Sequence, residues 1–483
     1  MSTQMTLPTH SLAAVLIAPS AANPTVTPVV LLAADTVAAH LAALSSPQRA
    51  QLDAQQFKAV PGAQAILFDA NGELESILCV ASANPLYALA KLSGSIAPGD
   101  YQLSQTAENL SLLALGFALG TYQFTRYKAK AKKTPPRLVI ADAKARTAAA
   151  NAAHAIATAR DLVNTPTEDL GPAHLSQLAA EIAKRHGGNF REIVGEQLLA
   201  ERFPAIHAVG RASHRDPRLI ELSFGEAKHP LVGEAEHPTK YPLIVLVGKG
   251  VCFDTGGLDM KASDGMALMK KDMGGAAVAL ALTELILQAG LKIRLKLLIP
   301  AVENAIGPDA YRPGEIIATR AGLSVEIGNT DAEGRVILCD ALTYAAEFKP
   351  ELIIDFATLT GAARIALGPD LPATFSNQDD VLQNLLAAGK LAADPLWPMP
   401  LWHEYQRLIE SPIADLNNAG SSRMGGAITA ALYLEHFIPK SQPWVHIDTY
   451  CWNDSDRPGR PRGGECQSLR AVFSYLQLRF GVS

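Results

Sequence analysis

The sequence predicts an α/β protein: a smaller N-terminal α/β domain, a long linking helix, and a larger C-terminal domain with a mixed, mostly parallel central sheet covered by helices. Three observations lead to this prediction. Apolar strand-like runs alternate with helical stretches from Leu243 onward, residues 144–163 are Ala-rich without Gly or Pro, and 48% of the 483 residues are hydrophobic. Such alternation is typical of parallel sheets with sites at the strand ends. The expected domains span residues 1–143 and 166–483, and the linking helix spans residues 144–165.

The elements of the N-terminal part follow from short apolar runs that alternate with helical stretches. Strands are expected at residues 65–69, 74–81 and 137–141, and helices at residues 85–93 and 107–119. No group of residues in this part forms a recognisable catalytic pattern.

In the C-terminal part the alternation is more regular. The expected strands cover residues 219–224, 243–247, 294–299, 352–357 and 444–447. The expected helices cover residues 173–185, 276–287, 336–347, 427–437 and 469–479. A polar loop is expected at residues 225–241.

The charge balance excludes some classes of function. The chain carries 42 Lys and Arg against 47 Asp and Glu, a net charge of −5, which argues against a protein that coats nucleic acid. The basic run 126–133 is interpreted as a solvated connector, because no basic surface with interleaved aromatic residues surrounds it. A nucleic-acid patch is the alternative for this run.

Cysteine usage and apolar runs bear on the compartment. Five widely spaced cysteines argue against a disulfide framework and indicate a reducing compartment. No basic residue precedes the apolar stretch 12–18, so no signal peptide is expected, and no run reaches the roughly 18 apolar residues of a membrane span. A cytoplasmic protein without membrane contact is therefore expected.

A first block of ionisable residues directly follows the predicted strand 243–247. Lys249 and Asp254 are expected to leave that strand into a Gly-rich loop that also contains Lys261, and Asp272 precedes the next helix. Charges between apolar elements need partners, because an unpaired buried charge is very costly. A nucleotide site is disfavoured, because the GxxxxGK[ST] spacing of a phosphate loop is absent.

A second block, Gly328-Asn-Thr-Asp-Ala-Glu-Gly-Arg335, leads directly into a predicted helix. Asp331 and Glu333 are two residues apart, so in an extended segment they share a side and can converge on one point. Capping of the following helix would explain these two acidic residues, but it explains neither the arginine nor the first block.

Together the blocks supply four carboxylates, from Asp254, Asp272, Asp331 and Glu333, which would repel one another at one site unless cations intervene. Two divalent ions balance four carboxylates, which predicts a two-metal hydrolase. Basic residues of the blocks would then stabilise an oxyanion or bind an anion. Lys249 is either a further cation or, when neutral, a metal ligand. A two-metal phosphoesterase is an alternative that the carboxylates alone also allow.

Histidines and cysteines add little to this site. His403, His436 and His446 lack the HExxH spacing, so structural or solvent-facing roles are favoured. Cys252 and Cys339 lie inside apolar sequence, which favours buried, unreactive thiols.

The two blocks resemble the signatures of the leucyl aminopeptidase family, the two-metal cytosolic aminopeptidases. The resemblance rests on the Lys/Asp block and on the highly specific motif Asn329-Thr-Asp-Ala-Glu-Gly-Arg335. It extends from about Arg160 to the C-terminus and includes Pro300-Ala-Val-Glu-Asn304 and Ala357-Thr-Leu-Thr-Gly361. Residues 1–140 resemble the family only in general character.

The resemblance implies a metal-dependent aminopeptidase that hydrolyses the N-terminal peptide bond through a hydroxide shared by two ions. The implied ligands of one ion are Lys249, Asp254, Asp272 and Glu333. The implied ligands of the other ion are Asp254, Asp331 and Glu333.

The resemblance also implies roles around the metal site. Lys261 matches the lysine that polarises the scissile carbonyl, and Arg335 matches the arginine that holds a bicarbonate as general base. The implied substrate contacts are Met269, Thr358, Leu359 and Gly361.

The family is typically a homohexamer that acts on peptides with Zn²⁺, Mn²⁺ or related ions, and the resemblance implies the same here. Two segments depart from the common pattern. Ala262 stands where many members have Pro, and Tyr450 and Trp452 are large residues where many members read Asp-Ile-Ala-Gly. That segment helps to form the specificity pocket, so the resemblance leaves the preferred first residue open.

Overall fold

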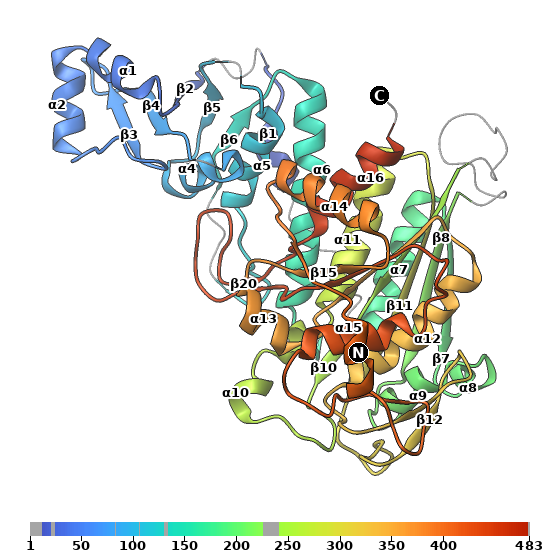
Figure 1. The fold of residues 1–483 in the computed structure, drawn as a ribbon. Coiled ribbons are helices and arrows are strands. Elements are labelled where there is room, and N and C mark those ends of the chain that lie inside the picture. The colour runs from blue at the N-terminus through green and yellow to red at the C-terminus, as the bar shows by residue number, and fades with distance from the viewer. Residues whose placement is uncertain are drawn as a thin grey trace. The chain divides into compact units, whose positions relative to one another are not determined.

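The computed structural model describes residues 12–20, 25–82, 84–105, 107–129, 134–225 and 241–481 (Figure 1). These residues form two compact units. The N-terminal unit contains the described residues up to 157 together with 455–462, and the C-terminal unit contains residues 158–454 and 463–481. Most of the loop expected at 225–241 and residues 130–133 of the basic run lie outside the described residues.

The N-terminal unit is built around one sheet with the strand order β1-β6-β5-β2-β4-β3. Its strands are β1 (Leu16–Ile17), β2 (Thr27–Leu32), β3 (Gln64–Phe68), β4 (Leu74–Val80), β5 (Asp100–Leu103) and β6 (Arg137–Val139). Neighbouring strands are parallel except for the antiparallel pair β3–β4. The strands expected at 65–69, 74–81 and 137–141 are confirmed to within two residues at each end.

The helices of this unit differ in part from expectation. They are η1 (Leu12–Val15), α1 (Val37–Ala43), α2 (Ser46–Ala54), α3 (Pro85–Ala88), α4 (Ala90–Ser95) and α5 (Leu110–Gly120). The helix expected at 85–93 is confirmed in part, because the stretch is helical but is interrupted at Leu89, which separates α3 from α4. Both pack on α5 at backbone distance, where a Cβ atom on Gly116 would lie 1.7 Å from the Leu86 carbonyl oxygen.

The long helix expected at 144–163 is confirmed as α6 (Ala143–Asn164). Its first part belongs to the N-terminal unit, and the part from Thr158 belongs to the C-terminal unit. Absence of Gly and Pro over this stretch explains why the helix continues without a break.

The C-terminal unit contains a large mixed sheet with the strand order β16-β15-β18-β14-β9-β11-β8-β7, and β10 also pairs with β11. Its strands are β7 (Asn189–Val194), β8 (Arg218–Phe224), β9 (Leu243–Gly248), β10 (Gly250–Asp254), β11 (Arg294–Asn304), β14 (Leu352–Ala357), β15 (Ala373–Ser376), β16 (Trp397–Pro398) and β18 (Trp444–Asp448). The central strands β18, β14, β9 and β11 are parallel, whereas β7, β8 and β15 pair antiparallel to their inner neighbours. The expected mixed, mostly parallel sheet is therefore confirmed.

The helices of the C-terminal unit are α7 (Pro172–His186), α8 (Gln197–Ala200), α9 (Pro204–Gly210), α10 (Ser263–Met266), η3 (Met269–Lys271), α11 (Gly274–Ala289), α12 (Glu333–Glu347), α13 (Gly361–Leu367), α14 (Asp379–Leu391), η4 (His403–Leu408), α15 (Gly426–Glu435) and α16 (Leu469–Phe480). Several of them, among them α7, α9, α11, α12 and α14, pack against the sheet, as expected. Smaller pairings join β12 (Ile316–Ala318), β13 (Ser324–Glu326) and β17 (Leu416–Asn417), and β19 (Trp452–Asn453) with β20 (Gly463–Gly464).

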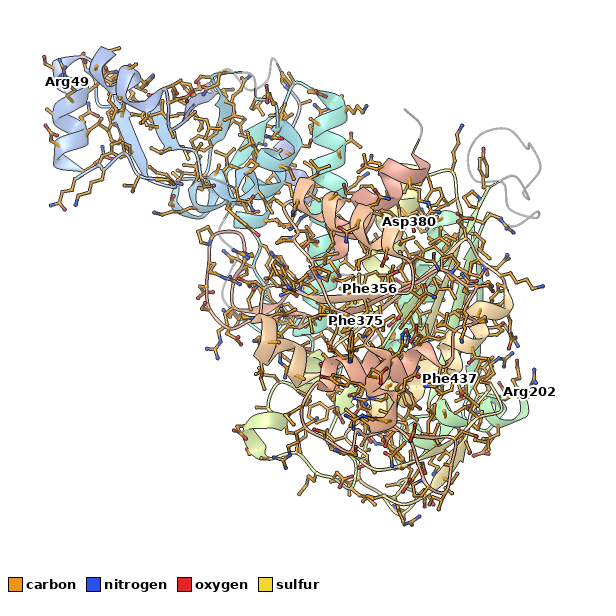
Figure 2. The ribbon with its side chains drawn as sticks, viewed as in Figure 1. Arg49, Arg202, Phe356, Phe375, Asp380 and Phe437 are labelled. Atoms are coloured by element: carbon orange, nitrogen blue, oxygen red, sulfur yellow. The ribbon has the colours of Figure 1, made fainter. Side chains whose placement is uncertain are left out.

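The core of this unit lies where helices meet the central strands. Val245 and Val247 of β9 belong to one cluster of buried residues with Val336 and Ile337 of α12, while α11 also packs on β9 and β14. Phe356 of β14 is fully buried, and Figure 2 labels it among the side chains of this unit. Because side chains alternate along a strand, β9 can contact helices with both of its faces.

One stretch of the C-terminal unit, residues 263–289, is long and apolar enough by length and composition to cross a membrane. Its most apolar window is 83% buried inside the fold, however. That burial is what the core helix of a globular unit shows.

One expectation about the first block is wrong. The segment after Lys249 is not a loop but strand β10, which pairs in parallel with residues 301–304 of β11. The reason is the length of β11, which extends past its pairing with β9 and offers its edge to a second strand. Asp254 is therefore the last residue of a strand and not part of a loop.

Candidate metal centre

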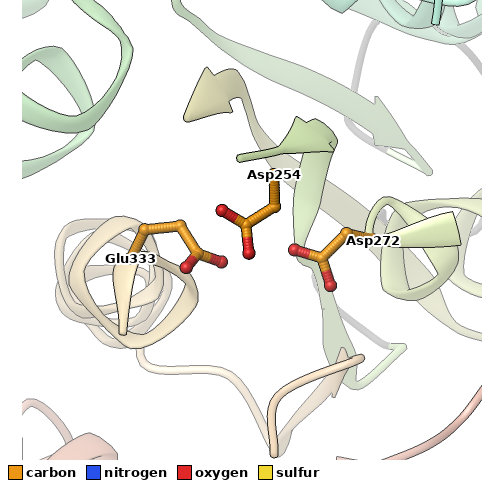
Figure 3. Close-up of side chains that lie close together, drawn as sticks. All are labelled: Asp254, Asp272 and Glu333. Atoms are coloured by element: carbon orange, nitrogen blue, oxygen red, sulfur yellow. The ribbon is translucent and has the colours of Figure 1, made fainter. Parts of the chain in front are cut away.

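Three carboxylates converge where β10, η3 and α12 meet. Asp254 ends β10, Asp272 follows η3, and Glu333 is the first residue of α12. Their side chains point toward one another in Figure 3, and one oxygen atom from each lies within 4.8 Å of the others. All three are at most 3% exposed. Buried carboxylates this close repel one another unless cations or protons intervene.

Strand ends and helix starts bring these residues together. Parallel strands end at a common edge of a sheet, which gathers residues far apart in the sequence. Two glycines allow the helices to come close to that edge. A Cβ atom on Gly275 of α11 would lie 2.0 Å from the Phe356 carbonyl oxygen, and one on Gly334 of α12 would lie 2.6 Å from Lys249 Nζ.

Two lysines lie among the carboxylates. Lys249 Nζ is 2.8 Å from Asp272 Oδ2 and 2.8 Å from Glu333 Oε1. This position inside a carboxylate cluster contradicts a phosphate loop at the lysine. Lys261 Nζ is 2.9 Å from Asp254 Oδ2 and also pairs with Asp331 Oδ1.

The structure therefore brings together all of the predicted metal ligands and the predicted catalytic lysine. Asp331 joins the cluster through its contact with Lys261, and its side chain is the more exposed one, at 33%. Asp264, by contrast, lies in α10, where it accepts a hydrogen bond from the next backbone N–H.

The pKa directions show that the cluster has too few cations. Burial and the neighbouring Asp254 raise the pKa of Glu333 well above its ordinary value, and the same causes raise the pKa of Asp331 to about 6. Burial opposes protonation of Lys249, yet Asp272, Glu333 and Asp254 outweigh it and raise the pKa of this lysine. Four carboxylates face two ammonium groups, so a surplus of negative charge remains.

A divalent cation fits this surplus. Glu333 Oε2 is buried and accepts no hydrogen bond from any residue in the described part of the chain. Buried polar atoms in native proteins nearly always have a partner. Carboxylate oxygens suit divalent ions such as Mn²⁺ or Zn²⁺. A bound ion would displace the proton of Lys249, and its neutral amine nitrogen could then serve as a ligand.

Neighbouring polar groups fix the carboxylates so that one oxygen of each faces the centre. Asp254 Oδ1 accepts from Gly256 N at 2.8 Å and from Asn304 Nδ2 at 2.8 Å. Thr358 Oγ1 donates to Asp272 Oδ1 at 2.8 Å. Such outer partners orient ligands in metal sites. Asn304 is not among the predicted site residues, although its position at the end of a long apolar run is a usable signal.

Arg335 lies two residues beyond Glu333 on α12. Its Nη1 donates to the Asn418 carbonyl oxygen at 2.8 Å, while its buried Nε has no acceptor among the described residues. Burial lowers the pKa of this guanidinium. No carboxylate in the described part of the chain forms an ion pair with it, so it retains capacity for an anion.

The predicted substrate contacts lie around the same edge. Thr358 bonds to Asp272, and Leu359 N donates to Asp448 Oδ1 at 3.0 Å. Gly361 is the first residue of α13, and Met269 is the first residue of η3, which packs against β10. Asp448, at the end of β18, also accepts from Thr360 N and Oγ1. Asp448 holds the loop after β14 in place, and it is not among the residues predicted from the sequence.

The three histidines lie outside the carboxylate cluster. His446 is buried in the sheet, where its Nδ1 is 2.6 Å from Asp355 Oδ1, and His403 pairs with Glu435 at the surface. The thiols of Cys252 and Cys339 are buried as predicted, and burial raises the pKa of both well above the ordinary value.

The fold and the cluster define a two-unit α/β protein with a carboxylate–lysine centre suited to divalent metal ions. Comparisons with known proteins agree with this class. The model of the cytosol aminopeptidase family catalytic domain matches residues 157–472, and that of the M17 aminopeptidase N-terminal domain matches residues 27–141. The chain belongs to the cytosol aminopeptidase family, also called the leucyl aminopeptidase family, and is a metal-dependent aminopeptidase, a peptide hydrolase.

Relatives of known name show the same likeness. The chain is 40% identical to a probable cytosol aminopeptidase of Syntrophotalea carbinolica over 80% of this chain and 78% of the relative. A cytosol aminopeptidase of Coxiella burnetii, solved as a crystal structure, is 42% identical, with a TM-score of 0.89 over 97% of this chain and all of that chain. The bottromycin maturation enzyme BotP, solved in complex with Mn, is 29% identical, with a TM-score of 0.83 over 94% of this chain and 99% of that chain.

Proposed function

We propose that the chain hydrolyses the N-terminal peptide bond of peptides with two divalent ions, held by Lys249, Asp254, Asp272, Asp331 and Glu333. The observation that carries the proposal is the buried carboxylate cluster with its surplus negative charge, in a member of a metal-dependent aminopeptidase family. When bound, the ions would polarise the scissile carbonyl and lower the pKa of an attacking water.

Lys261 is the proposed stabiliser of the oxyanion that forms at the scissile carbonyl. Burial disfavours its charge, but Asp254, Glu333 and Asp331 outweigh burial and raise its pKa. A fixed ammonium donates hydrogen bonds to developing negative charge without reorganisation. Its contacts with Asp254 and Asp331 hold it at the edge of the cluster.

Arg335 is the proposed holder of a bicarbonate that serves as general base. A guanidinium stays protonated at neutral pH and is a poor base by itself. The free Nε of Arg335 supports anion binding at this position. A bound bicarbonate would provide the proton acceptor that neither Lys261 nor Arg335 offers.

Substrate contacts are proposed for Met269, Thr358, Leu359 and Gly361. Their support is the position of Thr358 against Asp272 and the anchoring of Leu359 by Asp448. These residues lie on loops and helix starts at the sheet edge, where substrates of open α/β folds bind.

Further properties are proposed from the family alone. We expect Zn²⁺ or Mn²⁺ as the ions, a homohexamer as the assembly, and the cytoplasm as the compartment. The Mn complex of BotP and the relatives' name, cytosol aminopeptidase, support the first and the last of these. The domain boundaries after residues 143 and 165 stay a prediction.

The test measures the release of N-terminal residues from aminoacyl p-nitroanilides. Metal-free protein should be inactive, and Mn²⁺ or Zn²⁺ should restore turnover together with two bound ions per chain by elemental analysis. Activity that persists in a preparation without detectable metal would contradict the proposal.

A further inference from the structure

Two aromatic residues after β18 each face a lysine of η3. Lys270 Nζ lies 5.8 Å from the centroid of the Trp452 ring, and Lys271 Nζ lies 5.1 Å from that of the Tyr450 ring. The guanidinium carbon of Arg364, on α13, lies 4.8 Å from the same Tyr450 ring. Two cations from different elements therefore contact one tyrosine.

This group borders the metal centre. Lys271 directly precedes Asp272 in the sequence. A Cβ atom on Gly274 would lie 2.7 Å from Cys451 Sγ and 3.1 Å from Thr358 Cγ2, so the segment with Tyr450 packs beside Thr358.

The other side of the group is also close to proposed substrate contacts. A Cβ atom on Gly361 would lie 3.6 Å from an Nη atom of Arg364. Lys271, Arg364 and Tyr450 are therefore neighbours of Thr358 and Gly361, the positions proposed to contact substrate.

Lys271 lacks an acceptor for its ammonium. The residue is 2% exposed, yet it forms no hydrogen bond or ion pair with any residue in the described ranges. Its neighbour Lys270 differs, because Lys270 Nζ donates to the Asn164 carbonyl oxygen at 2.7 Å. An ammonium on a side chain this buried, without a protein acceptor, favours an anionic ligand that can reach it.

The nearby carboxylate of Asp272 does not supply that acceptor. Its Oδ1 accepts from Thr358 Oγ1, and its Oδ2 faces Lys249 Nζ at 2.8 Å. The guanidinium of Arg364 likewise has no carboxylate or hydrogen-bond partner among the described residues, and it lies against the Tyr450 ring. Asp454 lies at the far end of that ring, where it accepts from Tyr450 Oη at 3.1 Å.

We propose that Lys271 and Arg364, which both contact the Tyr450 ring, recognise a carboxylate side chain on the first residue of the substrate. The enzyme then prefers peptides with N-terminal Glu or Asp over those with N-terminal Leu. This inference rests on the proposed function and names the substrate class of that site. Two neighbouring cations favour an anionic side chain on the substrate. They repel a cationic side chain, because like charges close together are destabilising.

The experiment compares kcat/KM of the Mn²⁺-loaded enzyme for p-nitroanilides of Glu, Asp, Gln, Leu and Lys. We expect kcat/KM for the Glu anilide to exceed that for the Leu anilide by about tenfold or more, because one charge-assisted hydrogen bond contributes that much. The Lys anilide should have the lowest kcat/KM. Lys271→Met and Arg364→Gln should each lower the Glu-to-Leu ratio by about tenfold. Lys390→Met, which removes an exposed lysine of α14, should leave the ratio unchanged.

A wild-type preference for Leu over Glu would overturn the inference, as would an unchanged ratio in Arg364→Gln, whose half-buried side chain makes misfolding a small risk. Loss of turnover on every anilide would count against the proposed function instead. In that case calorimetric titration of the metal-loaded chain with free L-glutamate and L-leucine still tests whether the site prefers a carboxylate side chain. Tighter binding of L-glutamate supports the recognition site, and equal or weaker binding contradicts it.

Discussion

Two buried glutamates of the C-terminal unit are in opposite electrostatic situations. Glu465 is held by Arg160 through two contacts of 3.0 and 2.9 Å and by Asn453 at 2.8 Å. Burial opposes ionisation, but Arg160 outweighs it and lowers the pKa of Glu465 to about 2. Burial and Asp254 instead raise the pKa of Glu333 well above its ordinary value.

The difference lies in the number of cations per carboxylate, since both residues are at most 5% exposed. Glu465 has a cation of its own, Arg160, and the two residues form a structural ion pair, called the closed pair below. Glu333 shares two lysines with three further carboxylates, so its cluster is incomplete without added positive charge. Unequal charge, and not burial alone, therefore distinguishes the metal centre from a structural ion pair.

The largest effect is expected from breaking the closed pair. Glu465→Gln leaves the Arg160 guanidinium buried without its counter-charge, which should lower the free energy of unfolding by about 3–5 kcal/mol. Urea unfolding measures this loss. The exposed pair of Glu351 with Arg479 is the matched control, and Glu351→Gln should cost about 1 kcal/mol or less. Equal effects of the two variants would contradict the distinction.

Lys261→Ala should affect turnover and leave metal binding in place. Loss of one oxyanion donor costs roughly a hundredfold to a thousandfold in kcat. Anilide hydrolysis measures the turnover, and elemental analysis of the same preparation measures the metal. If the variant lost its ions along with its activity, Lys261 would be part of the metal scaffold and not a donor to the oxyanion.

The smallest effect is a pH dependence of stability from the closed pair. The pKa of Glu465 is lower in the folded chain than the ordinary 4.5, so its stabilisation is present above about pH 4.5 and is lost as pH falls toward 2. Between pH 4.5 and pH 3 the wild-type chain should lose about 1.5 kcal/mol more than Glu465→Gln. If both chains lost the same free energy of unfolding between these pH values, Glu465 would not titrate in this range.

Much of the site was predictable from the sequence because its residues fall in two blocks next to strand ends and helix starts. Lys249, Asp254 and Asp272 lie within one stretch of sequence, and Asp331 and Glu333 lie within another. Only the contact between these two stretches in the folded chain had to be inferred. Long apolar periodicity likewise located the central strands and helices.

Other features depend on contacts that no local pattern reveals. Strand β10 forms because β11 extends past β9, and its glycine-rich sequence alone favours a loop. The pair of Arg160 with Glu465 joins residues 305 positions apart. The sequence also cannot show that Lys271 has no acceptor. Lys270 is the same residue type at the next position, yet its ammonium donates to the Asn164 carbonyl oxygen.

The most direct test of the account is a titration of metal-free protein with Mn²⁺, measured by calorimetry and elemental analysis. We predict two bound ions per wild-type chain and a loss of binding in Glu333→Gln, whereas Glu465→Gln, a variant of equal chemistry at the closed pair, still binds two. No bound ion in the wild-type chain, or unchanged binding in Glu333→Gln, would contradict the claim that the surplus carboxylate charge holds the metals.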